Sequence, residues 1–276
     1  MFRFRFILIL RSLLIPFLLL PSFTHAQENT LKVAISTSVH NSGLFPYLFD
    51  KFNVDNKYKI DLQIVGSGKA LRLGRLGAVD LVWVHSPKAE QKFIKDGHAL
   101  KHKTVMQNNF VIIGPTDDPN KIASSNNVID ALQKIYAEKV LFISRGDDSG
   151  THKKELELWK NAHVNPIGED WYIETGVGMA KTLNIAYTDN GYALTDRATF
   201  IVHSQPSHKI IMKDKHNLFN PYSILLVKNT KQTSLNKNTA AKAFFEWVSS
   251  NPGNSAIVDY KYSGQYLFKT EPLLDQ

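Results

Sequence analysis

Residues 60–73 read IDLQIVGSGKALRL, and this stretch decides the expected fold. Apolar and polar residues alternate over 60–65, which predicts a strand. A Gly-Ser-Gly turn follows, after which Ala70, Leu71 and Leu73 have the spacing of an amphipathic helix. A strand that leads through a glycine turn into a helix is the repeating unit of α/β folds with parallel sheets.

The same unit occurs on both sides of this stretch. Upstream, the apolar run Leu31–Ile35 predicts a strand, and a helical pattern begins after Ser42. Downstream, Asp80–Val84 predicts a buried strand, and Ser86-Pro87 begins another helix because proline suits the first helical turn. This part of the chain therefore reads as βαβαβα, which predicts a mainly parallel sheet with helices on its faces.

A second α/β segment follows, and two strands connect it to the first. Phe110–Ile113, which ends at Gly114-Pro115, is the expected first crossing. Ser223–Val227, which follows Asn220-Pro221, is the expected second crossing. Between them the pattern predicts helices over 127–137, 149–161 and 175–186 and strands over 140–143, 193–194 and 200–203.

The expected architecture is a two-lobed α/β fold in which each lobe is a mostly parallel sheet flanked by helices. A helix over 239–248 returns the chain to the first lobe. Lobe 1 is then expected to comprise residues 27–109 and 228–276, and lobe 2 residues 110–227. Two lobes joined by two crossings form a hinge, and the groove between them is the default place for a ligand.

Residues 1–26 have the pattern of a secretory signal peptide. A basic start precedes an apolar run, which closes with small residues at Thr24 and Ala26. A membrane anchor is the alternative, but Arg11 interrupts the run and leaves fewer than the about 20 residues that a span needs. We therefore expect a periplasmic protein that begins at Gln27 after cleavage.

The composition excludes several kinds of site and partner. The chain has no cysteine, so thiolate metal sites, disulfides and a lipid-anchored N-terminus are excluded. The net charge is +8, and the signal segment contributes three arginines and no acid, which leaves +5. Because the lysines are scattered, we expect no nucleic-acid partner, and the modest excess suits small anions. We expect no metal ion and no cofactor.

Three loops between a strand and a helix are rich in hydroxyl groups and glycine. A helix N-terminus leaves backbone N–H groups unpaired and carries a partial positive charge, so it binds anions without a metal. In open α/β sheets such loops meet at the C-terminal ends of the strands. The candidate binding residues in these loops are Ser36, Thr37, Ser38, Ser67, Arg145, Ser149, Gly150 and Thr151.

Each loop also has a simpler interpretation. The hydroxyl groups of 36–38 would cap a helix. The loop 66–69 would be a tight turn, since its glycine spacing does not match a P-loop. The loop 145–151 is more specific, because Arg145 adds a fixed charge and forked donors in front of two hydroxyl side chains.

The segment 145–156, RGDDSGTHKKEL, resembles the signature of the tungstate-binding periplasmic proteins. Four further segments resemble the same family in the same order, namely VGSGKAL (65–71), TGVGM (175–179), LTDR (194–197) and FNPY (219–222). Together they cover nearly the whole chain after the signal segment. The family's threonine-rich N-terminal loop falls on Ile35-Ser36-Thr37-Ser38, where Ile35 lacks a hydroxyl and Ser36 replaces a threonine.

The resemblance implies a type II periplasmic binding fold that closes like a clamshell on an oxyanion. Tungstate is the expected ligand and molybdate the second choice. The resemblance also implies a monomer that is not an enzyme and that delivers the oxyanion to an inner-membrane ABC permease.

Two alternatives stay open. Phosphate-binding proteins share a similar Arg-x-Asp-x-Ser-Gly-Thr loop, and a protonated phosphate needs an acceptor such as Asp147 or Asp148. Deprotonated tungstate or molybdate needs donors only, in which case either aspartate caps the helix or pairs with Arg145. A serine hydrolase would use Ser149 or Ser67 with a histidine, although the G-x-S-x-G motif is absent.

Overall fold

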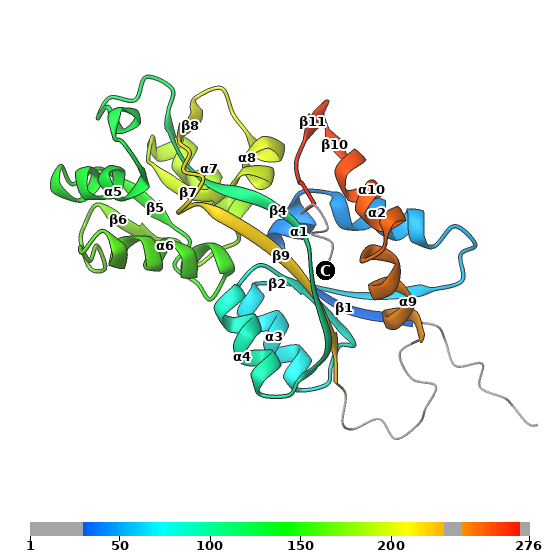
Figure 1. Ribbon diagram of the computed structural model, residues 1–276. Helices are drawn as coiled ribbons and strands as arrows, with labels where there is room; N and C mark the ends of the chain where they lie inside the picture. The colour runs from blue at the N-terminus through cyan, green and yellow to red at the C-terminus, as the bar shows by residue number, and fades with distance from the viewer. Residues whose placement is uncertain (1–29, 229–238, 271–276) are drawn as a thin grey trace, which may run out of the picture.

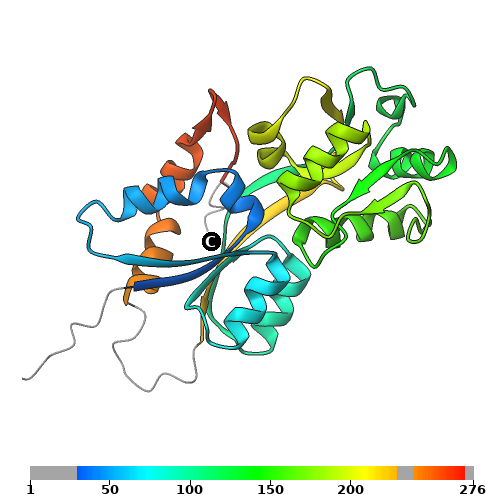
Figure 2. The same ribbon diagram turned by 180° about the vertical axis from the view of Figure 1, so that it is seen from behind.

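The structure, a computed structural model, describes residues 30–228 and 239–270. These residues form two groups of helices and strands that are joined by extended strands (Figure 1). The view from behind shows the same two lobes (Figure 2). The expected signal peptide, 1–26, lies outside the described residues. Within the described part, no helix combines the length and the apolar character that crossing a membrane requires.

Three parallel strands begin the sheet of lobe 1, namely β1 (Thr30–Ser36), β2 (Lys59–Val65) and β3 (Leu81–Val84). They lie in the order β2-β1-β3, and β1 pairs with β2 along its whole length. Because the strands run in the same direction, the loops that follow them meet at one edge of the sheet. These loops contain the first two of the predicted anion-binding segments.

Two long strands connect the lobes, β4 (Ala99–Pro115) and β9 (Phe219–Val227). They pair with each other in antiparallel register, from Ala99 opposite Val227 to Asn109 opposite Phe219. In lobe 1, β9 also pairs with β3. Beyond Asn109, β4 continues into lobe 2 (Figure 1). The predicted two-lobed α/β fold is confirmed.

The sheet of lobe 2, which was expected to be mostly parallel, combines both strand directions. There β4 pairs in antiparallel register with β7 (Ala193–Asp196) and β8 (His208–Met212). A parallel pair, β5 (Phe142–Ser144) and β6 (Tyr172–Glu174), is connected to this sheet by a bridge between Phe142 and Tyr192. A small hairpin, β10 (Lys261–Tyr262) and β11 (Gln265–Tyr266), follows the last helix of lobe 1.

Helices cover the sheets of both lobes (Figure 1). In chain order through lobe 1 they are α1 (Thr37–Asn41), α2 (Leu44–Phe52), α3 (Ser67–Arg75), α4 (Pro87–Lys95), α9 (Thr239–Val248) and α10 (Asn251–Asp259). The middle of the chain contains η1 (Ile122–Ser124), α5 (Val128–Ala137), α6 (Gly150–Asn161), α7 (Met179–Asp189) and α8 (Arg197–His203).

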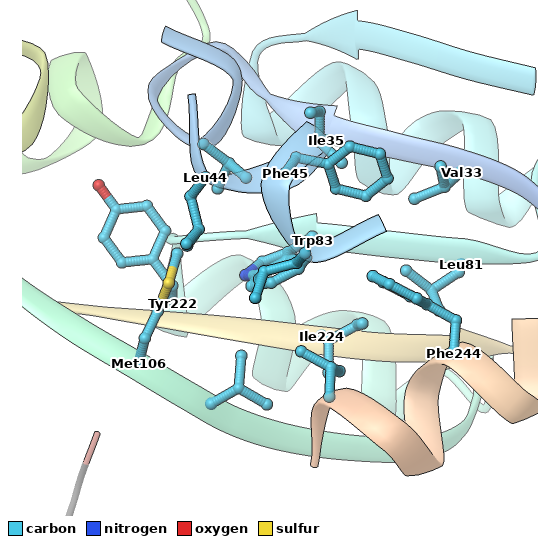
Figure 3. Packing of buried hydrophobic residues seen from close by; sticks show 14 of the residues in the cluster. Val33, Ile35, Leu44, Phe45, Leu81, Trp83, Met106, Tyr222, Ile224 and Phe244 are labelled. Atoms are coloured by element: carbon cyan, nitrogen blue, oxygen red, sulfur yellow. The ribbon is translucent and has the colours of Figure 1, made fainter. Parts of the chain in front are cut away.

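The core of lobe 1 follows from the alternation of side chains along its strands. Val33 and Ile35 of β1 face a cluster that includes Phe45 of α2 and Phe244 of α9. The Ala34 side chain between them belongs to a second cluster under α3 and α4. Figure 3 shows Trp83 at the centre of the first cluster, where it contacts the rings of Phe45 and Phe244. The inner strands β1 and β3 are therefore buried on both faces, as is typical of parallel strands, whereas the edge strand β2 is largely exposed.

Two expected elements differ from the structure. Residues 200–203, predicted as a strand, belong to helix α8, because Asp196 accepts a hydrogen bond from the Thr199 N–H at 2.9 Å and caps a helix there. The first crossing strand begins at Ala99, well before the predicted Phe110, because exposed polar residues such as Lys101 pair with β9.

The pairing of β9 bears on the expected lobe boundary at 227. Ser223–Val227, which we expected in lobe 2, pair with β3, and Ile224 and Leu226 contribute to the core of lobe 1. We propose that the lobes exchange near Asn109 in β4 and Phe219 in β9, where the two strands last pair.

Candidate functional site

The loops that follow the parallel strands contact each other where the two lobes meet. The Gly68 N–H at the start of α3 donates to the Asp148 carbonyl oxygen in lobe 2 at 3.4 Å. Lys88 of α4 and Glu157 of α6 form an ion pair at 2.5 Å. The predicted anion-binding loops of the two lobes are thus brought together.

The hydroxyl-rich loop after β1 is buried and internally bonded. Ser36 caps α1 by accepting the Val39 N–H at 3.5 Å, and its Oγ lies 3.1 Å from Ser38 Oγ. Both serine side chains are almost fully buried. The Thr37 hydroxyl has no hydrogen-bond partner among the described residues, which leaves it available as a donor.

Two of the facing helices begin without a side-chain cap. The N-cap residues of α3 and α7 are Gly66 and Gly178, and neither has a side chain that accepts from the first turn. Apart from the Gly68 N–H, which donates to Asp148, the N–H groups of these turns are available as donors for a ligand. Ser67, at the first position of α3, is buried and accepts the His85 N–H at 3.5 Å.

Arg145 is the buried cation of the predicted site. Its side chain is 3% exposed, its Nη2 donates to Asp147 Oδ2, and its Nε has no hydrogen-bond partner among the described residues. Asp147 Oδ1 accepts the Ser149 N–H at 3.0 Å, so both carboxylate oxygens of Asp147 have donors. A buried N–H without a partner in a loop that faces the groove suits an oxygen-rich anion.

The loop after β6 supports the backbone of Arg145 from within lobe 2. The Gly176 N–H donates to the Arg145 carbonyl oxygen at 2.9 Å, and the Thr175 N–H donates to Ser144 at 3.0 Å. The Thr175 hydroxyl repeats the bond to Ser144 at 3.0 Å. The segment 175–179, which resembles the tungstate-binding family, therefore fixes the position of the loop 145–151, here called the arginine loop.

The start of α6 contains the remaining predicted residues. Ser149 caps the helix by accepting the His152 N–H at 3.1 Å. Gly150 packs against lobe 1, since a Cβ there would lie 2.6 Å from the His85 carbonyl oxygen and 3.0 Å from His85 Nε2. The Thr151 side chain is buried, and its hydroxyl has no hydrogen-bond partner within residues 30–228 and 239–270.

His85, at the end of β3, is a central residue that the sequence analysis missed. Its Nε2 lies 2.9 Å from Ser38 Oγ, and its Nδ1 lies 2.9 Å from Asn220 Oδ1. The ring stacks on Tyr222 with centroids 4.6 Å apart. Its place directly after a buried strand and before the helix start at Ser86-Pro87 was the signal that could have identified it.

The network continues from His85 through both connecting strands. Asn220 Nδ2 donates to Asn108 Oδ1 at 2.7 Å and to Tyr222 Oη at 3.0 Å. Asn108 Nδ2 in turn donates to Asp196 Oδ1 at 3.4 Å. A chain of hydrogen-bonded polar side chains thus connects His85, in lobe 1, to Asp196 at the end of β7, in lobe 2.

A separate cavity of about 660 Å³ lies next to the connecting strands. Asn109 and Phe219 line it, together with Lys213, Lys215 and the C-terminal hairpin. It includes none of the predicted anion-binding residues, which lie in the contact zone between the lobes.

A buried carboxyl group lies behind the arginine loop. Glu155 of α6 accepts hydrogen bonds from Tyr172 Oη at 2.5 Å, Ser144 Oγ at 3.0 Å and Trp159 Nε1 at 3.3 Å. Burial raises the pKa of Glu155 to about 6, although these hydrogen bonds and nearby His152 lower it. The folded protein therefore holds a proton on Glu155 that the unfolded chain loses near pH 4.5.

This raised pKa predicts a stability change with a definite sign. The contribution of Glu155 to the free energy of unfolding is fully present below pH 4.5. It is lost as the pH rises through 6, and this loss lowers the free energy of unfolding by about 2 kcal/mol. Glu155→Gln should remove that loss, as urea unfolding at pH 4.5 and 7 would show. Glu157→Gln on the same helix is the control and should act in the opposite direction, because bonds to Lys88 lower the pKa of Glu157. An unchanged pH dependence in Glu155→Gln would contradict the prediction.

Comparisons with known proteins agree with this architecture. Residues 24–252 match the PBP superfamily domain. The chain is 39% identical over 236 residues to the tungstate-binding protein TupA of Peptoclostridium acidaminophilum, which covers 84% of the chain and 82% of that protein.

Two solved structures are also similar. The tungstate ABC transporter structure from Geobacter sulfurreducens has a TM-score of 0.74 and 41% identity, and the match covers 84% of this chain and 98% of that one. The tungstate-binding protein TupA from Desulfovibrio alaskensis G20 has a TM-score of 0.73 and 38% identity, with coverage of 87% and 98%.

Proposed function

Because the chain belongs to the PBP superfamily, and within it to the tungstate-binding proteins of the TupA type, we propose that it captures a tetrahedral oxyanion between its lobes for an ABC importer. Tungstate is the expected oxyanion and molybdate the second choice. The proposal rests mainly on Arg145. Its positive charge is buried, and its Nε–H group has no hydrogen-bond partner among the described residues.

In this proposal every group that meets the anion is a donor. Arg145 supplies charge and forked N–H groups, while Thr37 and Thr151 supply hydroxyls that have no partner in the described part of the chain. The first turns of α3 and α7 supply backbone N–H groups. Ser36, Ser38, Ser67, Ser149 and Gly150 complete the proposed site, either as donors or by shaping the loops that carry them.

We propose that the protein makes and breaks no covalent bonds. Ser38, His85 and Asn220 are linked in the order of a hydrolase triad. However, Asn220 is neutral, so it stabilises a protonated histidine less than the negative charge of an aspartate would. Esterase or phosphatase turnover that Ser38→Ala abolishes would support the hydrolase alternative instead.

The proposed location and partners follow from the same family. The protein is secreted through the signal segment 1–26, acts in the periplasm as a monomer, and delivers its anion to an inner-membrane permease. Tungstate-binding relatives of similar length support this assignment.

Calorimetric titration with tungstate, molybdate, phosphate and sulfate tests the ligand. We expect tungstate or molybdate to bind tightly and phosphate and sulfate weakly, because both carboxylate oxygens of Asp147 already accept a donor of the protein, which makes this carboxylate a weaker acceptor for the proton of a phosphate. Asp147→Asn should change tungstate affinity by no more than about fivefold, since it alters about one hydrogen bond.

Asp148→Asn is the matched control, because Asp148 is 64% exposed and pairs with Lys153 at 2.7 Å. Tight phosphate binding in the wild-type protein that collapses in Asp147→Asn, together with weak tungstate binding, would favour the phosphate-binding alternative.

A further inference from the structure

The hydrogen bonds between Asp196 and His85 have a fixed direction. A carboxylate only accepts, so Asp196 accepts from the amide nitrogen of Asn108. The Asn108 amide oxygen then faces Asn220 and accepts from its nitrogen. This leaves the Asn220 amide oxygen for His85, so His85 Nδ1 is the donor in that bond.

The direction of this network decides what Ser38 can offer to a ligand. A neutral His85 ring with its hydrogen on Nδ1 has a lone pair on Nε2. Ser38 Oγ, 2.9 Å from that nitrogen, must then donate its one hydroxyl hydrogen to the ring. Ser38 is left with lone pairs alone, which repel an anion that is fully deprotonated.

We propose that His85 takes up a proton when the oxyanion binds and thereby turns Ser38 into a donor for the anion. With a second hydrogen on Nε2, the ring donates to Ser38 Oγ, and the hydroxyl hydrogen of Ser38 is freed from the ring. It can then turn to the anion, for which Ser36 Oγ, 3.1 Å away, is the competing acceptor. His85 is therefore a positioning residue that acts through Ser38 and sets the number of donors in the site. This inference rests on the proposed oxyanion binding.

The groups around His85 favour a neutral ring before the anion arrives. Burial lowers the pKa of His85 and Arg145 adds to this effect, whereas Asp196 at the end of β7, the hydrogen bond to Asn220 and Glu90 on α4 act in the opposite direction. Tyr222 of β9 covers one face of the ring without charge.

A bound anion reverses this balance. The first residue of α6, Gly150, packs on the ring, since a Cβ there would lie 3.0 Å from His85 Nε2. An anion held at the N-terminus of α6 is therefore close to His85, and its negative charge stabilises the protonated ring.

Proton uptake can be counted directly. Tungstate is titrated calorimetrically into the full-length protein at about pH 7.5, in several non-phosphate buffers whose ionisation enthalpies differ. Tungstate carries no proton at this pH, so the slope of binding enthalpy against buffer enthalpy reports protons gained by the protein. We expect an uptake close to one proton per tungstate and an affinity that weakens by up to about tenfold per pH unit at higher pH.

The variant His85→Gln places an amide group near Ser38 that can donate without titrating. We expect its proton uptake to fall to nearly zero and its tungstate affinity to become independent of pH. His208→Gln is the matched control, because His208 is also buried with a lowered pKa but bonds to the Gly191 carbonyl oxygen in lobe 2. It should keep the wild-type uptake.

The outcomes separate this inference from the proposed function. Tungstate binding without proton uptake in the wild-type protein would overturn the role of His85 and leave oxyanion binding standing. Equal uptake in wild type and His85→Gln would overturn it as well. An absence of tungstate binding would overturn both. If His85→Gln does not fold, the pH dependence of the wild-type affinity decides.

Discussion

Arg145→Ala should weaken tungstate binding by about ten- to a hundred-fold while the protein stays folded. A hydrogen bond to a charged group contributes about 1.5–3 kcal/mol, and the side chain is almost fully buried in the arginine loop. The substitution also leaves Asp147 without its partner, which adds negative charge where the anion binds. Arg145→Lys should recover part of the affinity, because lysine keeps the charge but loses the forked donors.

The control for charge is Arg72→Ala, which removes an exposed arginine from α3. Calorimetry measures the affinities, and circular dichroism checks the fold. A dissociation constant for Arg145→Ala that equals that of the wild-type protein would remove Arg145 from the proposed site.

Gly150→Ala should weaken tungstate binding by about ten- to a hundred-fold, because it hinders the contact between the lobes. The apparent affinity falls in proportion to the fraction of molecules in which the lobes are closed and able to bind. The added methyl group would lie 2.6 Å from the backbone oxygen of His85, which is part of the opposite lobe and cannot rotate away. The fold within each lobe should be unaffected, since alanine suits the first turn of a helix. Calorimetry gives the affinity, and small-angle X-ray scattering shows whether tungstate still compacts the protein.

Lys88→Ala separates a steric block from the loss of a contact. It removes the ion pair with Glu157 between the lobes, but the lysine side chain is 84% exposed, so the effect should stay within about fivefold. Wild-type affinity in Gly150→Ala would show that the lobes need not approach as closely as they do here.

The sequence predicted those features whose signals are local. The strand, the glycine turn and the helix of 60–73 were recognisable from periodicity, and β2 and α3 lie there. The loop around Arg145 was recognisable because an arginine precedes helix-capping residues. That these residues contact an oxyanion stays a prediction.

The His85 network could not be predicted in the same way. Its members come from the end of β3, from both connecting strands and from the end of β7, and only the pairing of distant strands brings them together. The helix α8 was missed because its apolar residues Phe200, Ile201 and Val202 have strand propensity, whereas the cap at Asp196 decides the conformation.

The contribution of both chain ends to one core affects how the protein is assembled. Strand β1 packs against α9, so the first lobe cannot bury its apolar side chains until synthesis has passed α9. Contacts between residues so far apart in sequence slow folding, because a long loop must close before they form. A nascent chain with this topology remains unfolded longer than one whose first lobe is continuous in sequence. Such a delay suits the secretion proposed above, in which the polypeptide crosses a membrane before it folds.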